Sequence, residues 1–112
     1  MKPIVFEMAE FFKALGDPNR LKIIKMLNLN AENGMCVGAL AKRLGISQPA
    51  VSQHLKVLKY VGIVEPTRDG VRVHYRVNRE ALTSFRGKMD ELCRLANESC
   101  DECQPQEAAA EQ

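Results

Sequence analysis

The chain has 112 residues, of which 46% are hydrophobic and 27% are charged. This length predicts one domain, and the hydrophobic fraction excludes a wholly disordered chain. No apolar stretch reaches the ~18 residues of a membrane-spanning helix, and Glu7 and Glu10 within the apolar start argue against a signal peptide. We therefore expect a cytoplasmic protein with no membrane partner, whose four cysteines are reduced.

Positive charge is concentrated in the first part of the chain. Residues 1–78 contain 12 Lys and Arg against 6 Asp and Glu, whereas residues 79–112 contain 4 against 8. A basic segment of this kind favours a polyanionic partner, although an ordinary solvated face has the same composition. The charge pattern alone is therefore weak evidence for nucleic-acid binding.

The first half of the chain has the periodicity of helices. An apolar segment at 4–15 ends at Gly16, and Asp17 caps a second helix that runs from Pro18 to about 29. A short helix follows at 36–44, and a fourth begins after Ser47 and ends at Gly62. The apolar positions of the second helix that recur at helical spacing, and that we expect to face the core, are Leu21, Ile24 and Leu27.

From residue 63 the pattern changes to the alternation of a β-hairpin. A short extended run at 63–68 precedes Asp69-Gly70, which is a strong signal for a two-residue turn. Because Pro66 has no backbone N–H, the first strand should be an edge strand or be interrupted there. In the second strand the inward-facing residues are expected to be Val71, Val73, Tyr75 and Val77, and the outward-facing ones Arg72, His74 and Arg76. Helical spacing then returns from 79 to about 99.

The segment 38–60 has the spacing of a helix-turn-helix motif, with Gly45-Ile46-Ser47 joining two short helices. Val51, Leu55 and Leu58 form one buried stripe on the second helix. Its exposed start carries uncharged hydrogen-bonding side chains, which favour base readout in a major groove over simple solubility. Arg68 and Arg72 flank the hairpin turn and suit phosphates or a minor groove. The residues expected to bind DNA are Ser47, Gln48, Ser52, Gln53, His54, Lys56, Arg68 and Arg72.

These elements predict a mainly α protein with a small β-hairpin wing, which is a winged helix-turn-helix. A winged helix that binds protein is the first alternative, but it would not need the basic wing or the Ser and Gln cluster. An enzyme is the second, and the chain has no nucleophile–base pair and no glycine-rich phosphate loop. We therefore expect a DNA-binding protein and not an enzyme.

Three segments, FKALGDPNRLKIIKML, LAKRLGISQPAVSQHLKVLKYVGIV and RDGVRVHYRV, closely resemble the ArsR–SmtB family of metal-responsive winged-helix repressors. The resemblance covers about residues 8–85. It implies a homodimer on a palindromic double-stranded operator, from which an inducer releases it. Two sensor sites of that family are incomplete here: of a Cys-Val-Cys pattern only Cys36 is present, and the last helix has no histidine. The identity of a metal therefore does not follow from the resemblance.

Cysteines near the end of the chain offer a different sensor. Cys93, Cys100 and Cys103 share one face if the last helix continues, and three thiolates suit As(III) or Sb(III). Cys36 as a fourth ligand would allow Zn(II) or Cd(II). Cys100 and Cys103 are also a C-x-x-C pair, so thiol-redox or persulfide sensing is an alternative, as is a regulator with no metal inducer.

The first and last helices are more apolar than surface helices of a monomer need to be. Pairing across a twofold axis would bury their stripes and place two recognition helices on one face of DNA. The alternative is that the stripes complete the core of one chain. We expect a winged-helix and dimerisation domain at 1–99 and a flexible, acidic, cysteine-containing tail at 100–112. The predicted dimer residues are Phe11, Phe12, Leu82, Phe85, Met89 and Leu92.

Overall fold

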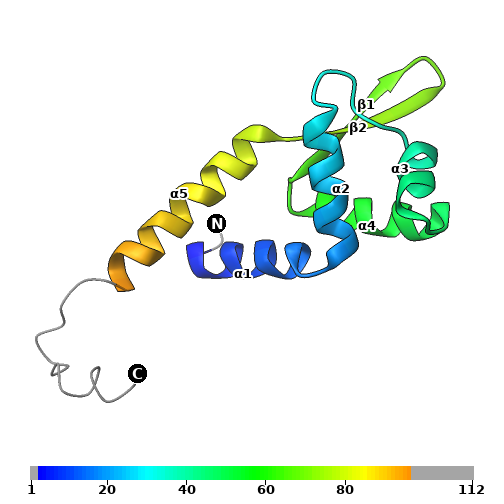
Figure 1. Ribbon diagram of the computed structural model, residues 1–112. Coiled ribbons are helices and arrows are strands. Elements are labelled where there is room, and N and C mark those ends of the chain that lie inside the picture. The colour runs from blue at the N-terminus through cyan, green and yellow to red at the C-terminus, as the bar shows by residue number, and fades with distance from the viewer. Residues whose placement is uncertain (1–2, 97–112) are drawn as a thin grey trace, which may run out of the picture.

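The computed structural model describes residues 3–96 and consists of five helices and one β-hairpin. A body formed by α2, α3, α4 and the hairpin lies at one end, and α5 extends away from it past α1 (Figure 1). The expected winged helix-turn-helix is thus confirmed. The elements in chain order are α1 (Ile4–Leu15), α2 (Pro18–Leu29), α3 (Val37–Leu44), α4 (Gln48–Tyr60), β1 (Val64–Asp69), β2 (Arg72–Val77) and α5 (Arg79–Ala96).

The core lies where α2, α3 and α4 meet the base of the hairpin. In α2 the buried residues are Ile23 and Leu27, whereas Leu21 is 51% exposed. The expectation that Leu21 faces the core was therefore wrong. Ile23 lies on the buried face of α2 in its place, and Ile24 packs at the edge of that face. The remaining buried positions are Ala14, Met35, Leu40, Ala41, Val51, Leu55, Leu58, Ile63 and Val64.

Helix α4 begins and ends as its sequence predicts. The Ser47 hydroxyl accepts a hydrogen bond from the Ala50 N–H at 3.2 Å, which caps the free start of the helix. Val51, Leu55 and Leu58 are at most 1% exposed, which confirms the predicted stripe. Burial of this stripe fixes the helix against the core and leaves its other face in solvent.

The hairpin turn lies one residue further along the chain than predicted. Asp69 pairs with Arg72, so the two loop residues are Gly70 and Val71 and not Asp69 and Gly70. Gly70 has a φ of +64°, which suits the first position of a type II′ turn. Val71 was expected to face inward, but it lies in the turn and is 95% exposed. Strand β1 runs through Pro66 without interruption because both strands are sheet edges.

The base of the wing is tied to the loop between α2 and α3. Met35 and Tyr75 exchange backbone hydrogen bonds of 3.1 and 2.8 Å, which adds a one-residue bridge to β2. Gly34 lies so close to β2 that a Cβ atom there would be 2.6 Å from the Tyr75 carbonyl oxygen. The N–H of Asn78, just after β2, donates to the carbonyl of Ile63, just before β1, at 2.7 Å. This hydrogen bond fixes the open end of the hairpin. The wing therefore has a defined orientation relative to the core.

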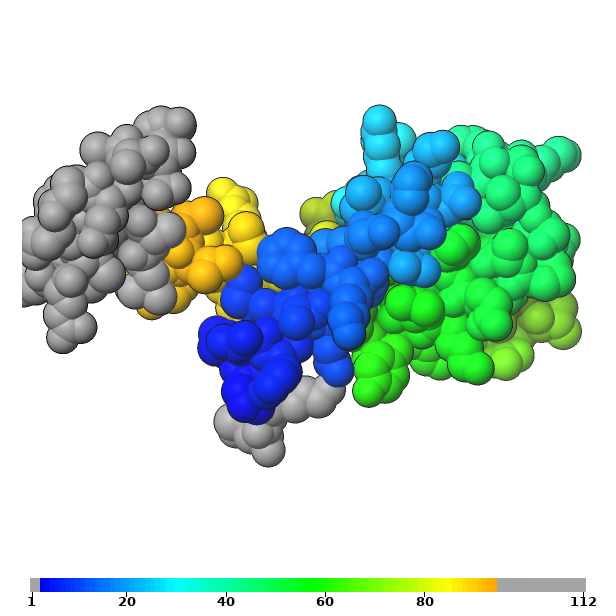
Figure 2. Space-filling view, turned by 90° about the horizontal axis from the view of Figure 1, so that it is seen from below, coloured from blue at the N-terminus to red at the C-terminus, as the bar shows by residue number. Residues whose placement is uncertain are grey.

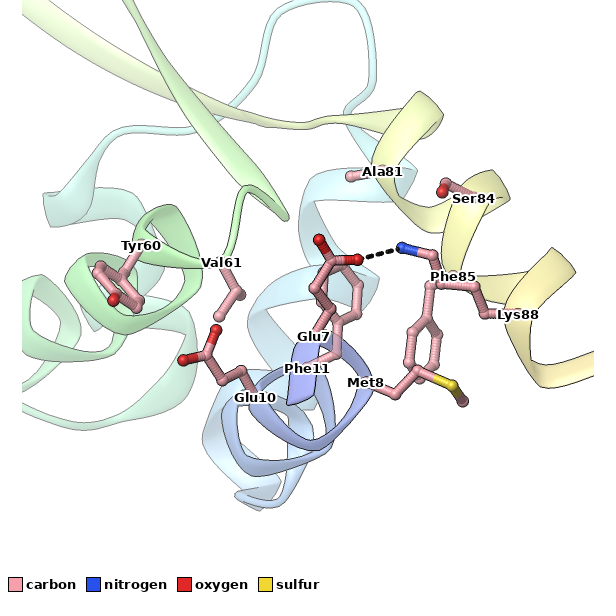
Figure 3. A pocket seen from close by; sticks show the side chains of 10 residues that line it. All are labelled: Glu7, Met8, Glu10, Phe11, Tyr60, Val61, Ala81, Ser84, Phe85 and Lys88. Atoms are coloured by element: carbon pink, nitrogen blue, oxygen red, sulfur yellow. Dashed lines mark hydrogen bonds and ion pairs between the residues drawn. The ribbon is translucent and has the colours of Figure 1, made fainter. Parts of the chain in front are cut away.

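Helix α5 begins on the core and continues along α1. Leu82 in its second turn packs against the core. Further along, the Phe85 ring stacks on Phe11 with centroids 4.6 Å apart and meets the edge of Phe12 at 5.2 Å. Lys88 Nζ lies 3.0 Å from Glu7 Oε1, at a cavity of about 330 Å³ that is lined by α1, α5 and the end of α4 (Figure 3). On the face shown in Figure 2, α1 lies between α5 and α4.

Candidate nucleic-acid interface

The start of α4 presents the predicted DNA-reading residues to solvent. They lie opposite the buried stripe of the same helix, on a rigid element that the core holds in place. The Oγ atom of Ser47 accepts the cap hydrogen bond, so its own hydroxyl proton is still available to a partner. The predicted residues of this helix and its cap that are exposed are Ser47, Gln48, Ser52, Gln53 and Lys56.

His54 differs from these neighbours because its side chain is only partly exposed. Its Nδ1 atom lies 3.2 Å from Nη1 of Arg20. The guanidinium of Arg20 also donates to the Ala14 carbonyl at 2.6 Å and to the Lys13 carbonyl at 3.4 Å. Sequence analysis did not single out Arg20, although it follows Pro18 by two residues and lies within the first segment that carries the family resemblance.

The Asp17 carboxylate holds the backbone of the same corner. It accepts hydrogen bonds from the N–H groups of Asn19 at 2.8 Å and Arg20 at 3.2 Å, as predicted for a helix cap. Desolvation by itself raises the pKa of this carboxyl. The two N–H groups, with the electrostatic effects of His54 and then of Arg20, outweigh that effect and lower the pKa below its ordinary value.

The wing carries its arginines at the tip. Arg68 and Arg72 are both exposed on either side of the turn. Arg76 is partly buried, because its side chain packs near Gly34 at the base of the wing. His74 is also partly buried and pairs with Thr67 across the hairpin. The accessible positive charge of the wing therefore lies at its tip and decreases toward its base.

In the described part of the chain, the cysteines do not form a complete metal site. Cys36 precedes α3 and is partly buried, and Cys93 is exposed on α5. Within residues 3–96 no three Cys, His, Asp or Glu side chains lie close enough to hold a metal ion. Cys100 and Cys103, like the predicted tail at 100–112, lie outside the described residues.

The predicted dimer residues divide into two groups. Leu82 and Phe11 are partly buried against the core of their own chain, as the monomer-core alternative requires. Phe85 and Met89 are also partly buried, and Phe85 contacts Phe11 and Phe12 of α1. Phe12 and Leu92 are 46% and 50% exposed, so they are accessible to a second molecule.

None of the helices within 3–96 has the length and apolar character of a membrane span.

Comparison with known proteins identifies the family. The sequence pattern described as "Bacterial regulatory protein, arsR family" matches residues 17–66. An uncharacterized HTH-type transcriptional regulator of Methanocaldococcus jannaschii is 42% identical over 85 residues, which are 75% of this chain and 92% of that protein. A probable mercury resistance operon repressor of Streptomyces lividans is 43% identical over 70 residues, 62% of this chain and 53% of the relative.

A solved structure agrees with this assignment. The homodimeric winged helix-turn-helix DNA-binding domain of a possible ArsR-family regulator from Mycobacterium bovis superposes with a TM-score of 0.64 at 27% identity. The alignment covers 90% of this chain and 88% of that domain. The expected fold and the expectation that the chain is not an enzyme are confirmed together. The chain belongs to the ArsR family of bacterial regulatory proteins, which are DNA-binding transcriptional regulators.

Proposed function

We propose that the protein is a sequence-specific transcriptional repressor that binds a palindromic double-stranded operator as a homodimer. The observation that carries this proposal is the exposed cluster of uncharged donors and acceptors at the start of α4. Its backbone is fixed by the Ser47 cap and by the buried stripe on its opposite face. A recognition helix needs this combination of a rigid support and accessible polar side chains.

The proposed contacts divide into those that read bases and those that bind phosphates. Gln48 and Gln53 have amide groups that can both donate to and accept from base edges in the major groove. Ser52, His54 and the Ser47 hydroxyl are shorter donors suited to bases or to the adjacent backbone. Lys56 on α4, and Arg68 and Arg72 at the wing tip, supply the charge that binds phosphates at neighbouring positions.

The proposed dimer uses the outer faces of α1 and α5. Phe12 and Leu92 are large apolar side chains left half exposed on these helices, and Val5 and Phe6 at the start of α1 are 69% and 63% exposed. A second copy would cover them. The homodimeric domain from Mycobacterium bovis supports this assembly. Two recognition helices on one dimer would read half-sites about one helical turn apart, or a multiple of it.

Two substitutions test the DNA-binding proposal. A binding site is first selected from random duplexes, and affinities for it and for unrelated DNA are then measured at several salt concentrations. Gln53→Ala should weaken specific binding by ~1–3 kcal/mol and leave binding to unrelated DNA almost unchanged. Arg72→Ala should weaken both and reduce the salt slope by about one. Thr83→Ala, at an exposed position on α5, is the matched control. Equal losses on both duplexes for Gln53→Ala would contradict base reading.

We further propose that a thiol-binding inducer releases the repressor, most simply a soft ion such as As(III), Sb(III), Cd(II) or Zn(II). The exposure of Cys93 on α5 supports this, as does the resemblance to a probable mercury resistance operon repressor. Cys100 and Cys103 would complete a three-thiolate site, with Cys36 an optional fourth ligand. Since ligand thiols give up their protons on binding, release should depend on pH.

Operator release by arsenite and by Cd(II) tests this inducer. Release should be lost when Cys93, Cys100 and Cys103 are all replaced by Ser, whereas Cys36→Ser should change only the Cd(II) or Zn(II) response. Full release from the triple variant would refute the tail site. Release by a disulfide-forming oxidant, reversed by dithiothreitol and absent with metal ions, would instead support the redox alternative suggested by the C-x-x-C pair.

A further inference from the structure

Arg20 connects three parts of the chain that meet at the corner between α1 and α2. Its Nε and Nη2 atoms donate to the carbonyls of Ala14 and Lys13 in the last turn of α1, at 2.6 and 3.4 Å. Its Nη1 atom lies 3.2 Å from Nδ1 of His54 on α4, which is 34 positions away in the sequence. One side chain thus joins the end of α1 to the recognition helix.

The corner is built to hold this guanidinium in place. The last carbonyls of a helix have no partner within the helix, and a cation beside them is favourable. The Asp17 carboxylate binds the backbone N–H of Arg20 at 3.2 Å and supplies a nearby negative charge. Arg20 is itself partly buried. Its planar, forked donors are therefore already oriented before DNA arrives.

The contact with Arg20 determines how the His54 ring is protonated. A guanidinium has only donors, so Nδ1 of His54 must be the acceptor in this hydrogen bond. The neutral ring then carries its proton on Nε2. Asp17 also interacts electrostatically with the His54 ring. The geometry with Nδ1 as acceptor is that of the neutral ring.

We propose that Arg20 is a positioning residue for DNA recognition. It fixes the His54 ring against the end of α1 and leaves Nε2–H as the single ring donor for a DNA phosphate. Arg20 itself does not contact DNA in this proposal. The inference rests on the proposed DNA-binding function, which it deepens by assigning a role to a residue outside the helix-turn-helix.

The protonation of the ring can be measured without DNA. His54 and His74 are the only histidines in the chain, so a His74→Gln variant assigns their ring ¹⁵N signals. At about pH 8.5, His54 should carry its ring proton on Nε2. Arg20→Gln should convert it to a mixture of the two neutral forms and leave His74 unchanged. A wild-type ring that is charged or protonated on Nδ1, or signals unaffected by Arg20→Gln, would overturn the proposal.

The effect on DNA binding is tested with a double-mutant cycle on the selected operator. Arg20→Gln and His54→Gln should each reduce affinity about tenfold, and the double variant should also lose about tenfold and not about 100-fold. Arg20→Lys, which keeps the charge but replaces the forked guanidinium by a single ammonium group, should recover part of the loss. Lys22→Gln removes the same charge from an exposed position on α2 and should change affinity less than about twofold. Thermal melting confirms that each variant is folded.

The outcomes separate this inference from the function on which it rests. Additive losses in the double variant, or a loss in Lys22→Gln as large as in Arg20→Gln, overturn the role of Arg20. If Gln53→Ala in that case still weakens binding to the selected operator more than binding to unrelated DNA, DNA reading stands and only the positioning role fails. If the wild-type protein binds no duplex, the proposed function fails, and with it the role of Arg20 in recognition.

Discussion

Gly34 offers a test of how the wing is attached to the core. Its φ is +72°, and a Cβ atom built on it would lie 2.6 Å from the Tyr75 carbonyl oxygen and 3.0 Å from Cγ of Arg76. The first of these distances is shorter than any van der Waals contact allows, and the obstacle is backbone, which cannot rotate away. Replacement of Gly34 by Ala must therefore displace β2 or the loop before α3.

The expected loss of folding free energy in Gly34→Ala has two parts. A matching substitution at Gly70 allows them to be measured separately. A non-glycine residue in the left-handed region costs ~1–2 kcal/mol, and this part alone applies to Gly70, where φ is +64° and no atom lies within 4 Å. The forced displacement at Gly34 adds ~1–3 kcal/mol, as for an overpacked core. Gly34→Ala should therefore cost about 2–5 kcal/mol and Gly70→Ala about 1–2 kcal/mol.

Urea denaturation of both variants measures the difference. Each kcal/mol should also lower the melting temperature by about 4–8 °C in a domain of this size. Because the carbonyl in question accepts the Met35 N–H at 3.1 Å, amide exchange at Met35 should accelerate in Gly34→Ala and not in Gly70→Ala. Equal losses of stability in the two variants, or an unchanged Met35 amide, would refute the close approach of the loop to β2.

Two further predictions follow from the exposed faces and the cap. Leu92→Lys should give monomers that lose high-affinity operator binding. Because Leu92 is half exposed, the variant should keep the melting behaviour of the folded chain. Sedimentation measures the oligomeric state, and a dimeric variant would contradict the prediction. Asp17→Asn should flatten the acid limb of the stability profile. Since the pKa of Asp17 is lowered in the folded state, its contribution is complete above about pH 4 and is lost as the pH falls further. Parallel acid limbs in both proteins would contradict that role.

The helices and the recognition motif could be predicted because each depends on local chemistry. The Asp17 and Ser47 caps, the glycines that end helices and the α4 stripe all act within a few residues of one another. Such signals are read directly from spacing. The position of each exposed residue on α4 follows from the stripe, because burial of one face of a helix determines which residues the other face presents.

The features that sequence reasoning missed depend on contacts between distant segments or on a small difference in register. Gly70 suits either the second or the first position of a two-residue turn. The pairing of Asp69 with Arg72 places it at the first position. Burial of Leu21 or of Ile23 depends on the rotation of α2 against its neighbours, and both choices have helical spacing. The contact between Arg20 and His54 has no periodicity at all, because it forms only when α4 packs beside the α1–α2 corner.

Helix α1 contacts both α5 and Arg20, the residue that reaches the recognition helix. Beyond Leu82, α5 rests on α1 through the contacts of Phe85 with Phe11 and Phe12. At its other end α1 is bound by Arg20, which also contacts His54 on the recognition helix. If the proposed inducer binds at Cys93 on α5, these contacts offer a route through α1 to the DNA-reading surface. Such coupling needs only a displacement that favours one orientation of α4. If the inducer favours the non-binding state of the protein over the DNA-binding state by a few kcal/mol, operator occupancy changes by ~100-fold.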